Sequence, residues 1–256
     1  MRWATDCELS GKVYQKKIPE TDAIFKRLAE THQKSAKDET TLRISIDAKA
    51  TIKLGNLSRG GKSRIPVNTL DHDFVRAEDK VHLLGFYLPY YGENFFFLLP
   101  SSLTADAIVD CMEVLWEMLK PRFGHIKKLL FNFDNGPDNN THRTQFMARL
   151  VKFVDNTGLE IELAYYPPYH SKYNPIERVW GVLEQHWNGS SLDSLKTVVQ
   201  MAKTMTYKGL HPVVTIVKKT YQKGVSLTKK AMKEVEKRLQ RSKELPKYFV
   251  SILTKT

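Results

Sequence analysis

The feature that most constrains the fold is a long run of strict alternation between apolar and polar residues. From Leu42 to Leu54, thirteen residues, every even-numbered residue is apolar and every odd-numbered residue is polar. Successive side chains of a β-strand point to opposite faces, so this pattern predicts a half-buried strand with Asp47 in the middle of its polar face. Strands usually have five or six residues, so we expect this one to be bent or split.

The rest of the chain alternates between strand and helix signals. Strands are predicted at about 82–88, 94–99, 126–133 and 159–163. Helices are predicted at about 104–121, 141–156 and 175–187, the last after the cap Asn174 and the first-turn Pro175. A short helix is also expected at 23–31. This order favours an α/β fold with a mixed five-stranded sheet flanked by helices.

Composition excludes several classes of protein. The 256 residues are 41% hydrophobic and 11% aromatic, which excludes a disordered chain. Apolar runs are no longer than a strand, so no membrane partner is expected. The first residues carry no apolar signal segment, and two cysteines provide no disulfide framework. These features favour a cytoplasmic enzyme or binding protein.

Charge is distributed unevenly along the chain. The net charge is +12, from 40 Lys and Arg against 28 Asp and Glu. Residues 196–256 hold 15 basic and 3 acidic residues, so they account for the whole surplus. A basic segment of this kind indicates a polyanionic partner, with nucleic acid as the first candidate. We expect this segment to be a basic helical tail.

Three acidic residues lie where rigid elements can bring them together. Asp47 is inside a predicted strand, Asp134 ends another, and Glu177 is in the first turn of a predicted helix. Phosphoryl transfer on nucleic acids often uses two divalent cations, and Mg²⁺ prefers hard oxygen ligands such as carboxylates. The three residues are therefore candidate ligands of such a centre.

Each of the three also has a structural interpretation. Asp47 suits a solvated strand face, and Asp134 suits a turn before Asn135-Gly136. Asn174 and Glu177 have the spacing of a capping box, in which both side chains satisfy the helix terminus. Other candidates are weaker: Asp71 and Asp73 as structural residues, Glu184 as a substitute metal ligand, and His170 and His186 in ordinary polar roles.

Three segments, in order, resemble the catalytic blocks of DDE transposases. They are Ile46-Asp47-Ala48-Lys49, Asn132-Phe133-Asp134-Asn135-Gly136-Pro137-Asp138-Asn139 and His170-Ser171-Lys172-Tyr173-Asn174-Pro175-Ile176-Glu177-Arg178-Val179-Trp180. The third block also resembles mariner-like enzymes. The nearest resemblance is to the Rhodopirellula-type insertion-sequence transposase family, which carries a similar Asp71-His72-Asp73-Phe74 segment and a similar Pro167-Pro168 loop. The resemblance extends from about Thr41 to the end of the chain.

This resemblance implies a ribonuclease H-like fold and a function. Asp47, Asp134 and Glu177 would be catalytic and would bind two Mg²⁺ or Mn²⁺ ions. The enzyme would cleave and join DNA strands at insertion-sequence ends, with transposon ends and target DNA as partners and a possible homo-oligomer. The implied organisation is an N-terminal remnant or linker (1–40), a catalytic domain (41–190) and a basic helical extension (191–256).

Such transposases normally carry an N-terminal recognition domain, for which forty residues are too few. We therefore expect an N-terminally truncated copy or fragment, with recognition of the ends by another segment or protein as the alternative. Two alternatives stay open: a transposase-derived DNA-binding remnant without mobilising activity, and another ribonuclease H-like nuclease.

Candidate DNA contacts fall in three segments. They are Arg59, Lys62 and Arg64 in a glycine-containing loop, His170, Lys172, Tyr173 and Arg178 around the third block, and Lys229, Lys230, Lys233 and Lys237 in the basic tail. Cations suit backbone phosphates, and aromatic rings suit unpaired bases. Solvated basic surfaces and tyrosines packed in the core are the structural alternatives.

Overall fold

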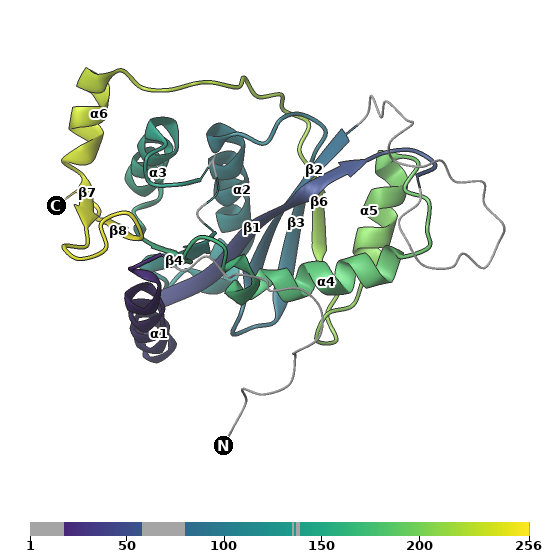
Figure 1. The fold of residues 1–256 in the computed structure, drawn as a ribbon, viewed down its shortest axis with the longest axis horizontal. Coiled ribbons are helices and arrows are strands. Elements are labelled where there is room, and N and C mark those ends of the chain that lie inside the picture. Colours follow the sequence, from purple (N-terminus) through teal and green to yellow (C-terminus); the bar gives the residue numbers. More distant parts are fainter. Residues whose placement is uncertain (1–17, 58–79, 135, 137–138, 256) are drawn as a thin grey trace.

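The computed structural model describes residues 18–57, 80–134, 136 and 139–255. Within these residues the core is one mixed sheet of eight strands in the order β6-β3-β2-β1-β4-β5-β8-β7 (Figure 1). The strands are β1 (Thr41–Lys53), β2 (Lys80–Leu88), β3 (Glu93–Leu99), β4 (Lys128–Phe133), β5 (Glu160–Tyr165), β6 (Val213–Ile216), β7 (Leu239–Arg241) and β8 (Phe249–Ile252).

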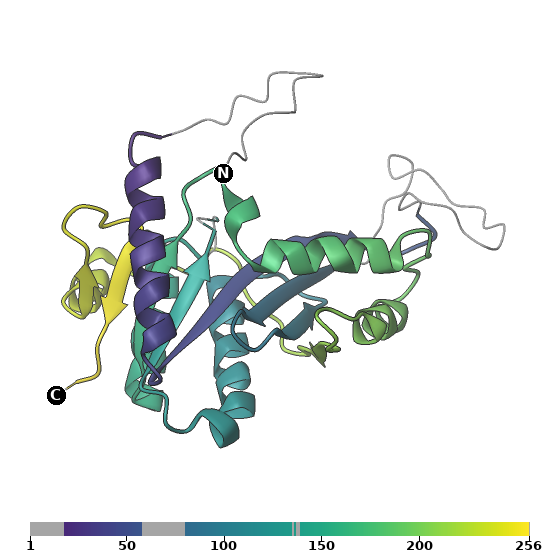
Figure 2. The same ribbon diagram turned by 90° about the horizontal axis from the view of Figure 1, so that it is seen from below.

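Helices cover both faces of this sheet (Figure 2). They are α1 (Thr21–Lys37), α2 (Ala105–Phe123), α3 (Thr144–Thr157), α4 (Ile176–Trp187), α5 (Leu195–Thr204) and α6 (Lys229–Glu236), with a short 3₁₀ turn, η1 (Ser171–Tyr173). The larger core includes α2 and α3, and the smaller core on the opposite face includes α4 and α5. This is the layered architecture expected from the order of elements.

β1 is central because it pairs with β2 on one side and β4 on the other. The β1–β2 pairing is antiparallel and includes Asp47 opposite Gly85, whereas the β1–β4 pairing is parallel and includes Ser45 opposite Asn132. β4 and β5 are also parallel, with α3 as the crossover between them. The strand predicted from the alternation is therefore the one that organises the sheet.

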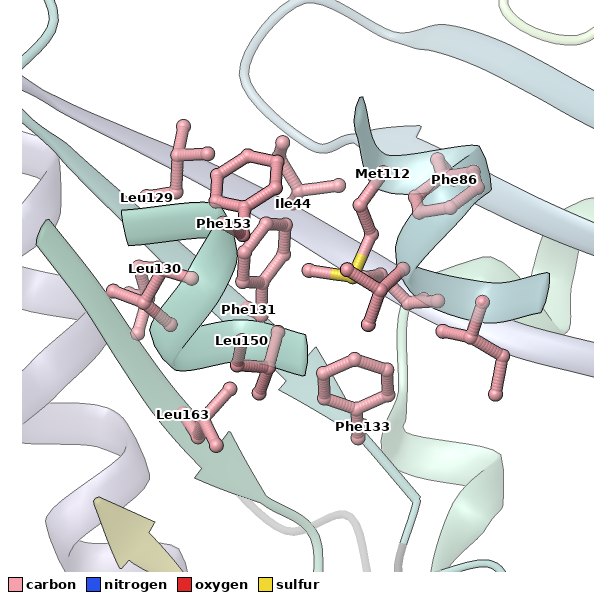
Figure 3. Packing of buried hydrophobic residues seen from close by; sticks show 14 of the residues in the cluster. Ile44, Phe86, Met112, Leu129, Leu130, Phe131, Phe133, Leu150, Phe153 and Leu163 are labelled. Carbon is pink, nitrogen blue, oxygen red and sulfur yellow. The ribbon is translucent and has the colours of Figure 1, made fainter. Parts of the chain in front are cut away.

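Both faces of β1 are buried over its first half, which differs from the expected half-buried strand. Even-numbered residues such as Ile44 pack with Phe131 and Leu150 in the larger core (Figure 3). On the other face Arg43, Ser45 and Asp47 are buried too. The polar face is covered because the loop before α4, and α4 itself, lie on it. Asp47 is therefore not a solvated strand residue.

The C-terminal part of the chain belongs to the sheet. The five predicted strands are all present, but β6, β7 and β8 were not predicted. β6 pairs with β3 at one end of the sheet, and β8 pairs with β5 toward the other. The prediction of a helical extension over 191–256 was therefore wrong, although α5 and α6 are helical. Phe249 and Ile252 of β8 are buried in the larger core, whereas β6 has no buried residue and is held by its pairing with β3.

The N-terminal helix is longer than predicted and belongs to the same core. α1 spans Thr21–Lys37, where a shorter helix was expected, and it buries Ile24 and Leu28. Phe25 makes edge-to-face contacts with the rings of His170 and Tyr173, just before α4. No helix in the described part of the chain has both the length and the apolar character that a membrane crossing requires.

Candidate active site

Asp47 is the buried centre of the site. Its residue surface is 7% exposed, and its Oδ2 accepts a hydrogen bond from Trp180 Nε1 at 2.8 Å. Burial and the negative charges of Asp134 and Glu177 together raise the pKa of Asp47 to about 8. Both other predicted carboxylates are therefore close enough for their charges to act on Asp47.

Asp134 approaches Asp47 because of the register between β1 and β4. Ser45 lies opposite Asn132 in this parallel pair, so continuing the register by two residues places Asp47 beside Asp134, directly after β4 ends. Burial raises the pKa of Asp134, while a hydrogen bond from Asn139 Nδ2 to its Oδ1 at 3.3 Å opposes that effect. The second predicted block thus ends a strand at the candidate site.

Glu177 enters the site through the anchoring of α4 on β1. Asn174 Nδ2 donates to the Ile46 carbonyl at 3.0 Å, and Ser45 Oγ donates to Asn174 Oδ1. Ser45 Oγ in turn accepts from the Ile176 backbone N–H at 3.1 Å. Ser45 therefore satisfies the helix terminus, and the side chain of Asn174 does not cap it. The capping-box interpretation of Asn174 and Glu177 was wrong, which leaves the carboxylate of Glu177 available for another role.

This anchoring can be tested with Asn174→Ala. The change removes two buried side-chain hydrogen bonds and leaves the Ile46 carbonyl without its amide donor, so we expect a loss of about 2 kcal/mol in the free energy of unfolding. Chemical denaturation followed by tryptophan fluorescence would measure it. Asn188→Ala, at the exposed C-terminal end of α4, is the matched control and should change stability by less than about 0.5 kcal/mol. Equal losses in the two variants would contradict the anchoring role.

An open cavity of about 810 Å³ lies against the carboxylates. Asp47 and Asp134 line it together with the starts of α2 and α3 and residues 222–226. Glu177 is not among its lining residues. The cavity therefore opens on the side of Asp47 and Asp134, where a substrate can approach them.

The donor atoms at the site suit a hard divalent cation. All three candidate ligands are carboxylates, and the like-charge repulsion that raises the pKa of Asp47 is the kind that a bound cation relieves. In the described part of the chain, no three His, Cys, Asp or Glu side chains are arranged to hold one ion among them. The arrangement is compatible with ions that are each held by a pair of carboxylates. Asp47 is the member common to both pairs, because the charges of Asp134 and Glu177 both act on it.

The substitute candidates occupy structural positions. Glu184 forms an ion pair with Lys49 at 2.5 Å and accepts from Trp187 Nε1 at 2.6 Å. His186 lies 3.0 Å from the hydroxyl of Thr204. Asp71 and Asp73 lie outside the described residues.

The candidate DNA contacts are placed differently from one another. Lys172, Tyr173 and Arg178 are exposed beside Glu177, whereas His170 is 2% exposed and its Nδ1 lies 2.8 Å from the Pro168 carbonyl. His170 is thus buried against the loop and not directed at a DNA surface. The four tail candidates, Lys229, Lys230, Lys233 and Lys237, are exposed on or beside α6. Arg59, Lys62 and Arg64 lie outside the described residues.

Sequence reasoning missed the residues that hold the carboxylates in place. Trp180 was named only as the last residue of the third block, yet its indole N–H donates a hydrogen bond to Asp47. A buried indole usually finds a hydrogen-bond acceptor, and that rule was the available signal. Ser45, Asn139 and Gly85 carried no signal of their own, because their roles depend on contacts between distant segments.

A mixed sheet of this order, with acidic residues on the central strand, after the neighbouring strand and at the start of a helix packed on them, is the architecture expected for a DDE domain. Comparison with protein families confirms this class. The chain belongs to the Rhodopirellula transposase DDE domain family, whose model matches residues 10–254. No curated protein matches the chain in sequence.

Solved structures of the mariner transposase Mos1 share the fold. The chain is similar to Mos1 in a paired-end complex with Mn (15% identity, TM-score 0.52) and in a paired-end complex with the left transposon end (14% identity, TM-score 0.51). A third is the paired-end complex with Mg (15% identity, TM-score 0.50). The matches cover 77%, 78% and 78% of this chain, which spans 58%, 56% and 56% of those chains. They confirm the ribonuclease H-like fold expected from the sequence.

Proposed function

We propose that this chain is the catalytic domain of a metal-dependent DNA transposase that cleaves and joins strands at insertion-sequence ends. Membership of the Rhodopirellula transposase DDE domain family supports the class of reaction. The observation that carries the proposal is the placement of Asp47 and Asp134 on the wall of one cavity, with Glu177 near enough for its charge to raise the pKa of Asp47. A protein that only bound DNA would gain nothing from burying like charges together.

Asp47, Asp134 and Glu177 would hold Mg²⁺ or Mn²⁺, as two ions that share Asp47. The oxygen donors and the central place of Asp47 support this assignment. Mos1 has been solved with each of these metals. The cations would supply positive charge that lowers the pKa of an attacking water and stabilises the leaving 3′ oxygen.

Side chains around the three carboxylates hold them in fixed orientations. Trp180 fixes one oxygen of Asp47, and Asn139 donates to one oxygen of Asp134, so each carboxylate keeps a defined direction. Ser45 and Asn174 fix the start of α4, and with it the backbone of Glu177. Positioning of this kind supplies much of the rate enhancement in phosphoryl transfer.

DNA and a second copy of the chain are the proposed partners. Mos1 forms paired-end complexes and binds a transposon end. On this chain, the exposed Lys172, Tyr173 and Arg178 next to Glu177 would contact DNA near the cut. The exposed lysines on and beside α6 would contact backbone phosphates farther away.

A strand-cleavage assay with Mn²⁺ tests the proposal, with Asp134→Ala and Glu177→Gln as the variants. Parent protein should nick labelled DNA only when Mn²⁺ or Mg²⁺ is present, and both variants should lose the activity. The matched control is Glu184→Gln, since Glu184 lies two turns farther along the same helix and pairs with Lys49. It should keep cleaving.

A parent protein without metal-dependent cleavage would refute catalysis and leave a DNA-binding remnant. Equal activity in the parent and Asp134→Ala would refute the assignment of the carboxylates.

A further inference from the structure

Residues 217–227 form a strap that crosses the helices beside the candidate active site. The strap leaves the end of β6 and passes over α2 toward α3 and α6 (Figure 1). Its first residue is fixed by a hydrogen bond from the Val217 N–H to the Leu98 carbonyl at 2.9 Å. Its last residue is fixed by a hydrogen bond from the Leu227 N–H to Thr144 Oγ1, also at 2.9 Å. Both ends of the strap are therefore tied to the catalytic fold.

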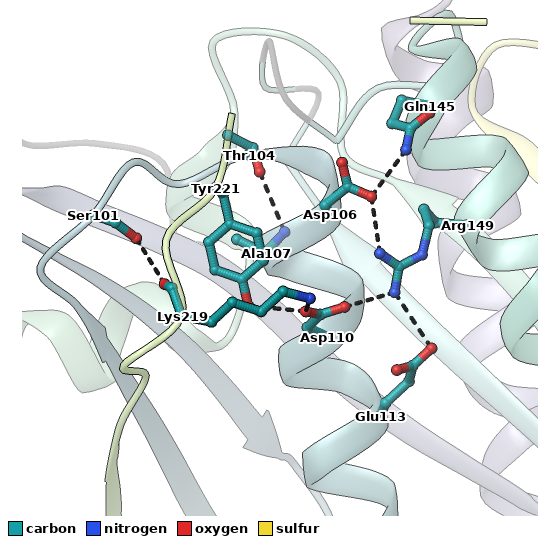
Figure 4. Close-up of polar contacts among 10 residues, drawn as sticks. All are labelled: Ser101, Thr104, Asp106, Ala107, Asp110, Glu113, Gln145, Arg149, Lys219 and Tyr221. Carbon is teal, nitrogen blue, oxygen red and sulfur yellow. Dashed lines mark hydrogen bonds and ion pairs between the residues drawn. The ribbon is translucent and has the colours of Figure 1, made fainter. Parts of the chain in front are cut away.

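A polar network fastens the middle of the strap to α2 (Figure 4). Asp110 accepts hydrogen bonds from Lys219 Nζ at 2.6 Å and from the Tyr221 hydroxyl at 3.0 Å. Arg149 on α3 holds the other oxygen of Asp110 at 2.6 Å. Although burial raises the pKa of Asp110, these donors lower it below its ordinary value. Asp110 is thus a charged anchor that joins α2, α3 and the strap.

Beyond this anchor the strap becomes a wall of the cavity that Asp47 and Asp134 line. Residues 222–226 all line that cavity. Gly224 has φ +77°, in the left-handed region that favours glycine, so the bend in this wall is specified by the sequence. A segment that reads as part of a basic tail therefore completes the candidate active site.

Lys223 is the residue of this wall with the clearest capacity to bind an anion. It is exposed and forms no ion pair with another described residue. Lys49, the other lysine in the cavity wall, is already paired with Glu184. The chain thus places an uncompensated cation on the wall of a cavity that two carboxylates also line.

We propose that Lys223 binds a backbone phosphate of a single DNA strand whose scissile phosphate lies at Asp47 and Asp134. This inference rests on the proposed function and names a contact for its substrate. The open cavity has a volume of about 810 Å³, within the range of sites that take small molecules, so it admits a short length of one strand. Carboxylates repel phosphates, and a cation nearby on the wall offsets that repulsion.

The test compares Lys223→Gln with Lys218→Gln. Both lysines are exposed on the same strap, but only Lys223 lines the cavity. Binding of a fluorescein-labelled single-stranded oligonucleotide, followed by anisotropy without divalent metal, should be about fivefold weaker for Lys223→Gln. The slope of log affinity against log salt should become shallower by about 0.7, the value for one phosphate contact on a single strand. Lys218→Gln should match the parent in both measurements.

A second variant tests the strap itself. Lys219→Met combined with Tyr221→Phe removes both donors from the strap to Asp110 and leaves Lys223 in the sequence. We expect the same loss of affinity as in Lys223→Gln, because the lysine is no longer held at the cavity. Circular dichroism would show that the fold is kept.

Equal binding by Lys223→Gln and Lys218→Gln would overturn the inference, as would parent-like binding by the strap variant. Neither result would touch the proposed function, which depends on metal-dependent cleavage by the parent. Conversely, a parent that binds through Lys223 but never cleaves would refute catalysis and keep the contact.

Discussion

Asp47→Asn is expected to abolish strand cleavage and, in metal-free buffer, to make the protein more stable. Asparagine keeps the shape of the side chain and an oxygen that accepts from Trp180 Nε1. It removes the negative charge that burial, Asp134 and Glu177 all disfavour. Loss of the proposed central metal ligand should lower the cleavage rate by at least about 10³-fold.

The gain in stability should depend on pH in a defined direction. The pKa of Asp47 is about 8 in the folded protein, above its value in an unfolded chain. The folded state therefore binds more protons between about pH 4 and 8, so this group's contribution to stability falls as pH rises through that range. The variant lacks this loss. We expect the free energy of unfolding of Asp47→Asn to exceed that of the parent by about 2 kcal/mol near pH 8.5, which corresponds to roughly 4–8 °C in melting temperature. Near pH 4 the two proteins should be equally stable.

Thermal melts across this pH range, with and without Mg²⁺, would measure both effects. Mg²⁺ should raise the melting temperature of the parent and have little effect on Asp47→Asn. Asp193→Asn is the control, because the carboxylate of Asp193 is exposed and hydrogen bonds from Thr197 and Ser194 lower its pKa. It should show no gain at high pH. A variant that is less stable than the parent at pH 8.5 would contradict the repulsion inferred at the site.

The sequence predicted the elements whose pattern is local. The alternation from Leu42 to Leu54 predicted the central strand, and the helix predicted at 141–156 is present as α3, which ends before Gly158 at φ +71°. The three carboxylates were also named from the sequence, because Asp47 lies inside a predicted strand, Asp134 ends another and Glu177 is in the first turn of a predicted helix. Local pattern was sufficient for the strand and helix, whereas the proposed role of the carboxylates depended on the resemblance of their three blocks to DDE transposases.

The features that were missed depend on tertiary contacts. β6 and β8 are four residues each in a lysine-rich region, too short for periodicity to separate them from loop. They are strands because β3 and β5 offer partners. Asn174 has the residue type and position of a helix cap, but its side-chain oxygen accepts from Ser45 Oγ and its amide donates to the Ile46 carbonyl of β1. At this position, long-range hydrogen bonds override the local preference of Asn for capping a helix.

The second large effect is expected from Gly85→Ala, a substitution that adds one methyl group. A Cβ at Gly85 would lie 2.3 Å from Cη2 of Trp180, 2.6 Å from Cζ2 of the same ring and 2.8 Å from Cδ1 of Ile176. The indole cannot move aside, because it is 4% exposed and packs on Phe96 with ring centroids 5.1 Å apart. The helix that carries Trp180 and Glu177 must therefore shift away from the sheet.

We expect Gly85→Ala to lower the free energy of unfolding by about 3 kcal/mol, and the melting temperature by roughly 6–12 °C. Cleavage should fall as well, because Asp47 lies opposite Gly85 and loses its bond from Trp180 when the ring moves. The matched control is Gly181→Ala in α4, where an added Cβ meets no atom within 4 Å. That change should stabilise the helix by about 0.5–1 kcal/mol.

The double variant Gly85→Ala with Trp180→Phe separates packing from hydrogen bonding. Phenylalanine lacks Cη2 and Cζ2, so it should relieve the overlap and restore part of the lost stability. It also lacks the indole N–H, so the carboxylate of Asp47 loses its donor and cleavage should stay low even where the fold has recovered. A double variant that regained full cleavage would show that Trp180 only packs against Gly85. One that regained stability alone would show that the N–H of Trp180 orients Asp47 for the reaction.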